Sequence, residues 1–177
     1  MLCQAYSQGV SKLNICTVIG FPLGYDVTDS KAAAARAAVD DGADELDMVV
    51  NISDVRNAAF AEVKTEIAEL RKIAGSRILK VIIETCYLSE PEKVELCRIV
   101  TEAGADYIKT STGLGTAGAT MEDVLLFKAN IGKEVKIKAA GGIRAREDMV
   151  AFLEAGCDRL GTSSAVKLLT GGAAQGY

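Results

Sequence analysis

Six short apolar runs, rich in β-branched residues, recur along the chain, and longer stretches with the periodicity of helices separate them. Each run predicts a buried strand of a parallel sheet, since such a sheet is covered by helices. The alternation continues to the end of the chain and therefore predicts six βα units. The predicted strands are residues 14–19, 45–50, 79–85, 107–110, 135–139 and 159–162.

The stretches between the runs carry the start and stop signals of helices. Residues 89–92 read Ser-Glu-Pro-Glu, which is a capping box with proline in the first turn. Gly104 and Gly156 stand where helix-terminating glycines belong. A helix is predicted over residues 144–155, with three inward-facing side chains: Met149, Phe152 and Leu153.

Regular βα alternation predicts an α/β fold with a parallel sheet, either doubly wound or closed as a TIM (β/α)8-type barrel, and the pattern alone does not give the strand order. A full barrel usually needs about 250 residues. The 177 residues hold six units, so we expect a single, incomplete barrel domain over residues 1–177. Residues 1–10 resemble the last turns of a helix, and no strand is predicted before them.

Composition supports one globular domain, because 49% of the residues are apolar and 25% are charged. The net charge is only -4 and no long run of like charges occurs, so no nucleic-acid partner is predicted. The chain has neither an apolar stretch of about 18 residues nor the opening pattern of a signal peptide. We therefore expect a cytoplasmic protein with no membrane partner.

The five cysteines show no metal-ligand spacing and no paired framework, so we interpret them as reduced and mostly packing residues. Histidine is absent, which removes the commonest general base and the commonest transition-metal ligand. No metal site is expected. Any chemistry has to use Lys, Asp, Glu, Ser, Thr, Tyr or Cys.

Lysines inside predicted strands are the first candidates for chemistry, since lysine is rarely buried without a reason. Lys109 and Lys138 lie close to the C-terminal ends of their strands, where barrels assemble active sites. Two ammonium groups in one site repel each other, so one becomes a neutral amine that can attack a carbonyl. Lys136 shares a strand face with Lys138, and spacing alone does not choose between them. Lysines that extend to the rim of the sheet are the alternative interpretation.

Three acidic residues lie in or beside the predicted strands. Asp47 is inside its strand, where a carboxylate needs a cation or a role as a proton acceptor. Glu84 lies nearer the rim, and we favour a structural role for it. Glu45 follows Asp44, and we expect it to be solvated.

Three loops rich in small residues follow the last three strands, at residues 111–113, 140–142 and 161–164. Amides and hydroxyls in such loops, ahead of a helix, bind anions without fixed positive charge. Barrels often place a phosphate in the last two of these loops. One glycine-rich loop is weak support because glycine also simply makes turns, but three on one rim predict a phosphate site.

Six ordered blocks of the chain resemble the deoxyribose-phosphate aldolase family. They are Gly-Phe-Pro-Leu-Gly at 20–24, Asp-Glu-Leu-Asp-Met-Val at 44–49, Lys-Val-Ile-Ile-Glu-Thr at 80–85, Ile-Lys-Thr-Ser-Thr-Gly at 108–113, Lys-Ala-Ala-Gly-Gly-Ile at 138–143 and Gly-Thr-Ser-Ser at 161–164. The match extends over nearly the whole chain and includes both lysine motifs.

The resemblance implies reversible cleavage of 2-deoxy-D-ribose 5-phosphate to D-glyceraldehyde 3-phosphate and acetaldehyde, without a cofactor. It implies Lys109 as the Schiff-base lysine, Lys138 rather than Lys136 as the neighbouring cation, and Asp47 as the carboxylate that relays protons. The residues implied or predicted to hold the substrate phosphate are Thr112, Gly141, Gly142, Ser163 and Ser164.

The resemblance also implies a homo-oligomer, commonly a dimer, and open strand edges would favour such association. The final Tyr177 resembles the mobile tail of some members, in which a tyrosine assists proton transfer.

Two features depart from the family pattern. The Asp-His-Thr motif of the first family strand and the Cys-Val-x-Pro-like segment of the second are not found, so the first two βα units are expected to be missing. Position 114 is Leu, where some members have a phosphate-contacting lysine. Two other interpretations stay open: a different phosphate-binding barrel lyase or isomerase, and an inactive fragment retained as a structural or interaction protein.

Overall fold

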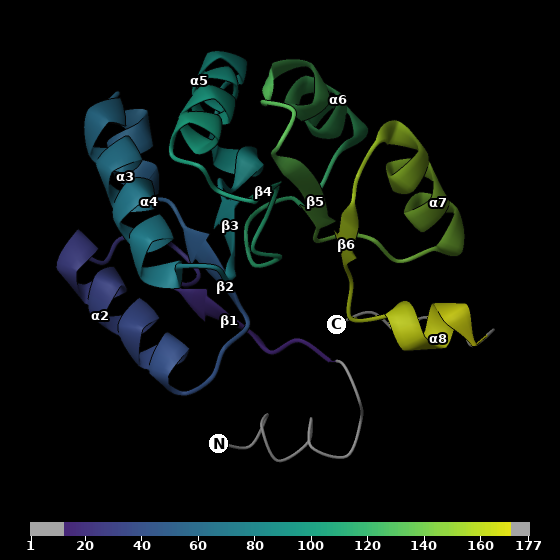
Figure 1. Cartoon of the computed structure of the whole chain (residues 1–177). Helices are drawn as coiled ribbons and strands as arrows, with labels where there is room; N and C mark the ends of the chain where they lie inside the picture. Colours follow the sequence, from purple (N-terminus) through teal and green to yellow (C-terminus); the bar gives the residue numbers. More distant parts are fainter. Residues whose placement is uncertain (1–12, 171–177) are drawn as a thin grey trace.

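The computed structural model describes residues 13–170, in which strands and helices alternate (Figure 1). All neighbouring strands are parallel, and their order in the sheet is their order in the chain, β1-β2-β3-β4-β5-β6. A doubly wound sheet would change direction within this order, so the barrel alternative is the correct one. The strands are β1 (Cys16–Ile19), β2 (Glu45–Val49), β3 (Ile78–Ile82), β4 (Tyr107–Lys109), β5 (Lys136–Ala140) and β6 (Arg159–Gly161).

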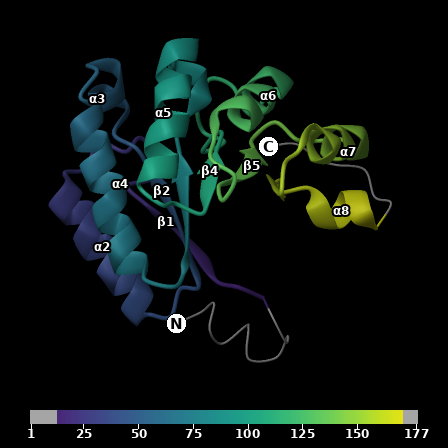
Figure 2. The ribbon, with the colours of Figure 1, turned by 45° about the horizontal axis from the view of Figure 1, so that its top comes forward.

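The sheet is curled into an arc, with β1 and β6 at its two ends and the larger helices along its outer side (Figures 1 and 2). Together these elements make a partial (β/α) barrel of six strands. The α-helices are α2 (Thr28–Asp40), α3 (Ile52–Arg56), α4 (Phe60–Ala74), α5 (Glu90–Glu102), α6 (Met121–Asn130), α7 (Arg146–Ala155) and α8 (Ala165–Leu169), and η1 (Thr85–Tyr87) is a short 3-10 helix.

The hydrophobic core lies between the outer face of the arc and the helices. One continuous apolar cluster joins alternate strand residues such as Leu46, Met48 and Val81 to the inner stripes of α4 and α5. Successive side chains of a strand point to opposite faces, so these residues occupy one face only. Burial of each large side chain of this kind stabilises the fold by about 1.5–3 kcal/mol.

The intervening strand residues point to the inner, concave side of the arc, and many of them are charged. They include Glu45 and Asp47 on β2, Lys80 on β3, Lys109 on β4 and Lys138 on β5, and ion pairs connect these side chains to one another. The strands are therefore apolar on one face and ionic on the other, although in sequence they read as largely apolar runs.

Local sequence signals account for several helix boundaries. The Ser89 amide and hydroxyl both donate to the Glu92 carboxylate, at 2.6 and 2.7 Å, so the predicted capping box is confirmed at the start of α5. Gly156 ends α7 with φ 113°, a left-handed conformation that suits glycine. The start predicted for α7 was two residues too early, since the helix begins at Arg146.

The prediction that Leu153 faces inward is wrong, because its side chain is 49% exposed. The elements against which α7 packs are α6 and β6. Phe152 is buried, as predicted. Met149 is partly buried against the core, as predicted.

The described cysteines differ in their surroundings. Cys97 and Cys157 are buried packing residues, Cys86 is half-buried, and Cys16 is exposed on β1. Within residues 13–170, no helix is long and apolar enough to cross a membrane. The helix end predicted for residues 1–10 and the tail residue Tyr177 lie outside the described residues.

Candidate active site

The Asp47 carboxylate is the centre of the ionic cluster on the concave face. Its Oδ2 accepts hydrogen bonds from Lys109 Nζ at 2.9 Å and from Lys138 Nζ at 2.8 Å. Its Oδ1 accepts a hydrogen bond from Lys80 Nζ at 2.7 Å. The fold thus brings together the three residues proposed from sequence for catalysis, which β2, β4 and β5 supply, and adds a third lysine.

The ionisation of these groups follows from burial and from the shared carboxylate. Burial opposes the ionisation of Asp47, but the charges of Lys109 and Lys138 outweigh it and hold the pKa of this carboxyl well below its usual range. Burial lowers the pKa of Lys109, and the charge of Lys138 adds to this, while Asp47 partly opposes both. Lys109 is therefore the amine of this cluster that loses its proton more readily than an ordinary lysine.

Lys80 is a charged residue of this site that the sequence reasoning missed. Its side chain is completely buried, and its Nζ lies 2.5 Å from Glu45 Oε2 as well as 2.7 Å from Asp47 Oδ1. Burial lowers its pKa, but the hydrogen bonds to Asp47 and Glu45 prevail and raise it. A usable signal was present, because Lys80 stands inside an apolar strand run in the same way as Lys109.

Glu45 was expected to be solvated, and this expectation is wrong. Its side chain is buried on the concave face and accepts hydrogen bonds from Lys80, from Arg159 and from the Asn14 amide at 3.1 Å. Burial disfavours its charge, but the bonds to these partners lower its pKa to about 2. The physical reason is strand periodicity: Glu45 stands two residues before Asp47 and therefore points to the same face.

Glu84 holds the loop that follows β4. Its buried carboxylate accepts hydrogen bonds from the backbone amide and the hydroxyl of Thr112. Glu84 itself has a left-handed backbone, with φ 53°, which few non-glycine residues adopt. This geometry favours the structural role, and it shows that the Thr112 hydroxyl already serves to fix the loop.

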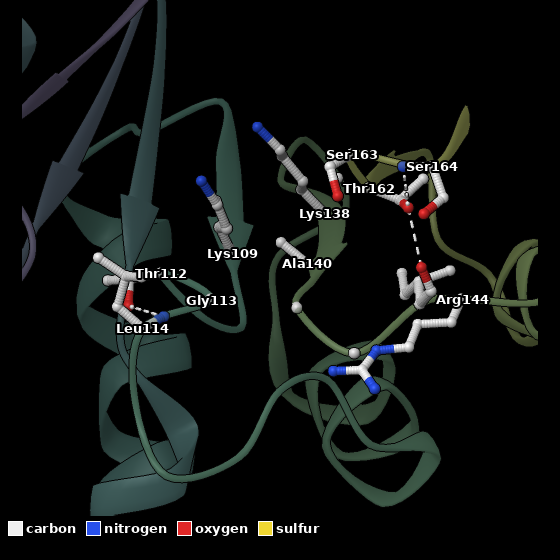
Figure 3. A pocket seen from close by; sticks show the side chains of 14 residues that line it. Lys109, Thr112, Gly113, Leu114, Lys138, Ala140, Arg144, Thr162, Ser163 and Ser164 are labelled. Atoms are coloured by element: carbon white, nitrogen blue, oxygen red, sulfur yellow. Dashed lines mark hydrogen bonds between the residues drawn. The ribbon is translucent and has the colours of Figure 1, made fainter. Parts of the chain in front are cut away.

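A pocket of about 400 Å³ opens beside the two lysines (Figure 3). Lys109 and Lys138 line one side, and the loops that follow β4, β5 and β6 line the rest. Every residue predicted for phosphate binding lines this pocket: Thr112, Gly141, Gly142, Ser163 and Ser164. Asp47 does not line it, because it is buried behind the lysines.

Close backbone packing shapes the loop after β5. Gly141 and Gly142 have positive φ values of 84° and 76°. The Ala119 amide donates to the carbonyls of Ala140 and Gly141, both at 3.1 Å, and a Cβ on Gly118 would stand 2.3 Å from the Gly141 oxygen. Gly118, which was not predicted as a site residue, thus packs against the pocket-lining Gly141 at a position that only glycine fits.

Of two further cations, Arg144 lines the pocket and Lys136 does not. Figure 3 shows the side chain of Arg144 extended along the rim. Arg144 was predicted as a helix residue and not as a site residue. Lys136 is exposed, lies 5.8 Å from the centre of the Tyr107 ring, and does not reach Asp47. Within residues 13–170 there is no cluster of His, Cys, Asp or Glu that could hold a metal ion.

Fold and site define a class: a (β/α)-barrel of the aldolase type, with paired lysines and a carboxylate beside a phosphate-sized pocket. The sequence model of the DeoC/LacD family aldolases matches residues 2–171. The chain belongs to this family.

Individual relatives agree with the family assignment. The chain is 62% identical to the deoxyribose-phosphate aldolase of Clostridium botulinum (strain Alaska E43 / Type E3). The match of 166 residues covers 94% of this chain and 75% of that protein. It is 58% identical to the deoxyribose-phosphate aldolase of Clostridioides difficile (strain 630), over 89% of this chain and 72% of that protein.

Solved structures of aldolases have the same fold. The aldolase QR15 superposes with a TM-score of 0.88 at 42% identity, covering 94% of this chain and 76% of that one. The tetrameric deoxyribose phosphate aldolase of Aeropyrum pernix superposes with a TM-score of 0.86 at 34% identity, covering 96% and 71%.

Proposed function

We propose that the chain is a deoxyribose-phosphate aldolase, which cleaves 2-deoxy-D-ribose 5-phosphate reversibly to D-glyceraldehyde 3-phosphate and acetaldehyde through an imine on Lys109. The observation that carries the proposal is the position of Lys109. It is buried, has a lowered pKa, and lies between the Asp47 carboxylate and a pocket lined by anion-binding loops.

Lys109 is the nucleophile in this proposal. Its neutral amine attacks the aldehyde carbon C1 of the open-chain sugar, and loss of water leaves an imine. The imine withdraws electrons as the C3 hydroxyl loses its proton and the C2–C3 bond breaks. D-Glyceraldehyde 3-phosphate leaves, the remaining enamine gains a proton at C2, and water hydrolyses the imine to release acetaldehyde and the free lysine.

Asp47 and Lys138 are the groups placed to move these protons. Asp47 Oδ2 contacts both amines, and Lys138 also lines the pocket. The low pKa of Asp47 keeps it ionised, so it holds an ammonium on Lys138 while Lys109 is neutral. Lys138 then faces the bound substrate as the acid.

The opposite side of the pocket is proposed to bind the substrate phosphate. Backbone amides of Gly141 and Gly142 and the loop residues Ser163 and Ser164 supply hydrogen-bond donors there. Arg144 is the cation that lines the same pocket. This arrangement compensates for Leu114, which provides no charge at the position where some family members have lysine.

Trapping the imine tests the proposal directly. The purified chain is incubated with 2-deoxyribose 5-phosphate and borohydride, which reduces an imine to a stable secondary amine, and peptide mass spectrometry locates the added mass. We expect the adduct on Lys109 and its loss in Lys109→Ala. Lys136→Ala is the matched control. Lys136 is an exposed lysine on β5, the strand of Lys138, and its side chain does not reach Asp47.

The outcomes separate the competing interpretations. An adduct on Lys109 together with release of D-glyceraldehyde 3-phosphate supports the aldolase. No adduct from folded protein would favour an inactive fragment retained as a structural or interaction protein. No adduct, together with turnover of another phosphorylated substrate, would indicate a different barrel lyase or isomerase.

We also propose that residues 1–177 form one domain and that the chain is a homo-oligomer, with a dimer as the simplest form. A single apolar cluster supports the first point. Half-exposed apolar residues near the β1 edge, Val18, Leu23 and Tyr25, support the second. Light scattering of the purified chain measures the assembly.

The cytoplasmic location and the role of Tyr177 stay predictions. Cell fractionation tests the location, and truncation of the tail tests the role of Tyr177.

A further inference from the structure

Lys80 is the most enclosed cation of the site, yet it does not line the pocket. Its side chain is fully buried, and its Nζ contacts Asp47 Oδ1 at 2.7 Å and Glu45 Oε2 at 2.5 Å. The Cys16 sulfur lies 3.5 Å away on a third side. Because Lys80 is outside the pocket lining, it does not touch a bound substrate, so it can act only through its contact with Asp47 and through the electrostatic effect of its charge.

The two oxygens of Asp47 are divided between two sets of partners. Oδ1 accepts from Lys80 and from the Cys16 thiol, at 2.7 and 3.2 Å, whereas Oδ2 accepts from Lys109 and Lys138. Lys80 therefore fixes the rotation of the carboxylate. The oxygen that remains for the pocket lysines is Oδ2.

We infer that Lys80 is a positioning residue for the aldolase reaction: it locks Asp47 through Oδ1, and its permanent positive charge favours the neutral form of Lys109. The inference rests on the proposed role of Lys109 as the nucleophile. It gives the third lysine of the cluster a function that differs from that of the two lysines in the pocket.

The charges around Lys80 explain why the proton leaves Lys109. The concave face holds more cations than carboxylates, so one amine is under pressure to become neutral. Lys80 has two carboxylate partners, while Lys109 shares Asp47 with Lys138. Besides Lys80, the titratable and charged groups on this face are Cys16, Glu45, Asp47, Tyr107, Lys109, Lys136, Lys138 and Arg159.

Ionisation behaviour agrees with this division of roles. Despite its burial, the pKa of Lys80 is raised by Asp47 and Glu45, whereas burial and Lys138 lower the pKa of Lys109. Lys80 thus stays an ammonium in the pH range in which Lys109 titrates. A fixed charge that never leaves the site can set the proton affinity of its neighbour.

Removal of the Lys80 charge should raise the pKa of Lys109. With one positive charge fewer nearby, the ammonium form of Lys109 is more stable, so its pKa rises and less neutral amine exists at a given pH. The acid limb of the kcat/KM profile should move to higher pH by on the order of one unit. On that limb, kcat/KM at a fixed pH should fall about tenfold.

Three substitutions at Lys80 separate the charge from simple space filling. Lys80→Met removes both the charge and the hydrogen bond, Lys80→Gln keeps a donor without charge, and Lys80→Arg keeps the charge. Lys31→Met is the matched control, since Lys31 is also a fully buried lysine paired with a carboxylate but lies outside the pocket.

The measurement is kcat/KM for 2-deoxyribose 5-phosphate from about pH 5 to about pH 9, with folding monitored by circular dichroism. We expect the acid limb to move in Lys80→Met and Lys80→Gln and to stay in place in Lys80→Arg and Lys31→Met. An unchanged limb in Lys80→Gln would overturn the inference, and this variant alone decides the question if Lys80→Met does not fold. Failure of the proposed function looks different, because the unsubstituted chain would then form no adduct on Lys109.

Discussion

The Lys31 ammonium on α2 donates a hydrogen bond of 2.9 Å to Glu66 Oε2 on α4, and the same nitrogen donates to the Val49 carbonyl at the end of β2, also at 2.9 Å. The pair is almost completely buried. It connects two outer helices to the strand that carries Asp47. Its energetic value lies in the match between the two charges, since either charge alone would be costly in this position.

Breaking this pair should destabilise the fold. Lys31→Met leaves a buried carboxylate without its cation, and we expect the free energy of unfolding to fall by about 3 kcal/mol. Urea denaturation at neutral pH measures the change. The double variant Lys31→Met with Glu66→Gln should lose less than the single variant does, because no unpaired charge remains. Equal losses in both would contradict a favourable ionic match.

The stability of the fold should depend on pH through Glu45. Its pKa in the folded chain is about 2, compared with an ordinary value of 4.5. Because the folded state holds the proton more weakly than the unfolded state, the stabilisation is complete above about pH 4.5 and is lost as the pH falls towards 2. Asp47 contributes in the same direction. Chemical denaturation at a series of acidic pH values should show this decline, and Glu45→Gln should make it shallower.

The contact between Gly118 and the Gly141 carbonyl predicts a selective effect on the phosphate side. In Gly118→Ala the new Cβ would stand 2.3 Å from the Gly141 oxygen, so one of the two backbones has to move. We expect KM for 2-deoxyribose 5-phosphate to rise about tenfold, which is a loss of about 1.4 kcal/mol of binding. Borohydride trapping with acetaldehyde, which has no phosphate, should change little.

Gly75→Ala is the control for this prediction. Gly75, unlike Gly118, has a positive φ, of 60°, but a Cβ there meets nothing within 4 Å. It should cost some stability through backbone strain and leave KM unchanged. A similar rise of KM in both variants would mean that general loosening, rather than the pocket wall, is responsible.

Arg144 should contribute to binding of the phosphate and not to the chemistry. Loss of a charge-assisted hydrogen bond in Arg144→Gln is expected to raise KM for the phosphorylated substrate about tenfold, with kcat nearly unchanged. With unphosphorylated 2-deoxyribose the variant and the parent should be alike. Arg146→Gln, two residues later in α7 and not part of the pocket lining, is the control. A tenfold drop in kcat for Arg144→Gln would refute the assignment.

Much of the fold could be predicted from the sequence, because strand and helix signals are local. All six strands lie within the predicted runs except at two ends: β3 begins one residue early, at Ile78, and β5 ends one residue late, at Ala140. The order of the strands could not be predicted, since every parallel arrangement has the same hydrophobic pattern. Comparison of strand register settles it, because each strand pairs with the next one in the chain.

The site was partly predictable for a related reason. Lys109, Lys138 and Asp47 were conspicuous as charges in apolar strands. Glu45 was misjudged because its neighbour Asp44 suggested a solvated pair, whereas strand alternation separates the two side chains. Arg159 was missed because a charge at the start of a strand is ordinary. Its partner Glu45 lies 114 residues away in the chain.

The separation of apolar and ionic faces has a consequence for how the strands find their places. If β3 slipped by one residue, Lys80 would enter the hydrophobic core beneath α4, and Leu79 or Val81 would take its position among the carboxylates. Each such error would separate a charge from its partner and expose apolar surface. The ionic residues on the concave face thus specify the register of the strands during folding. The same side chains that would react with an aldehyde also make misaligned pairings unfavourable.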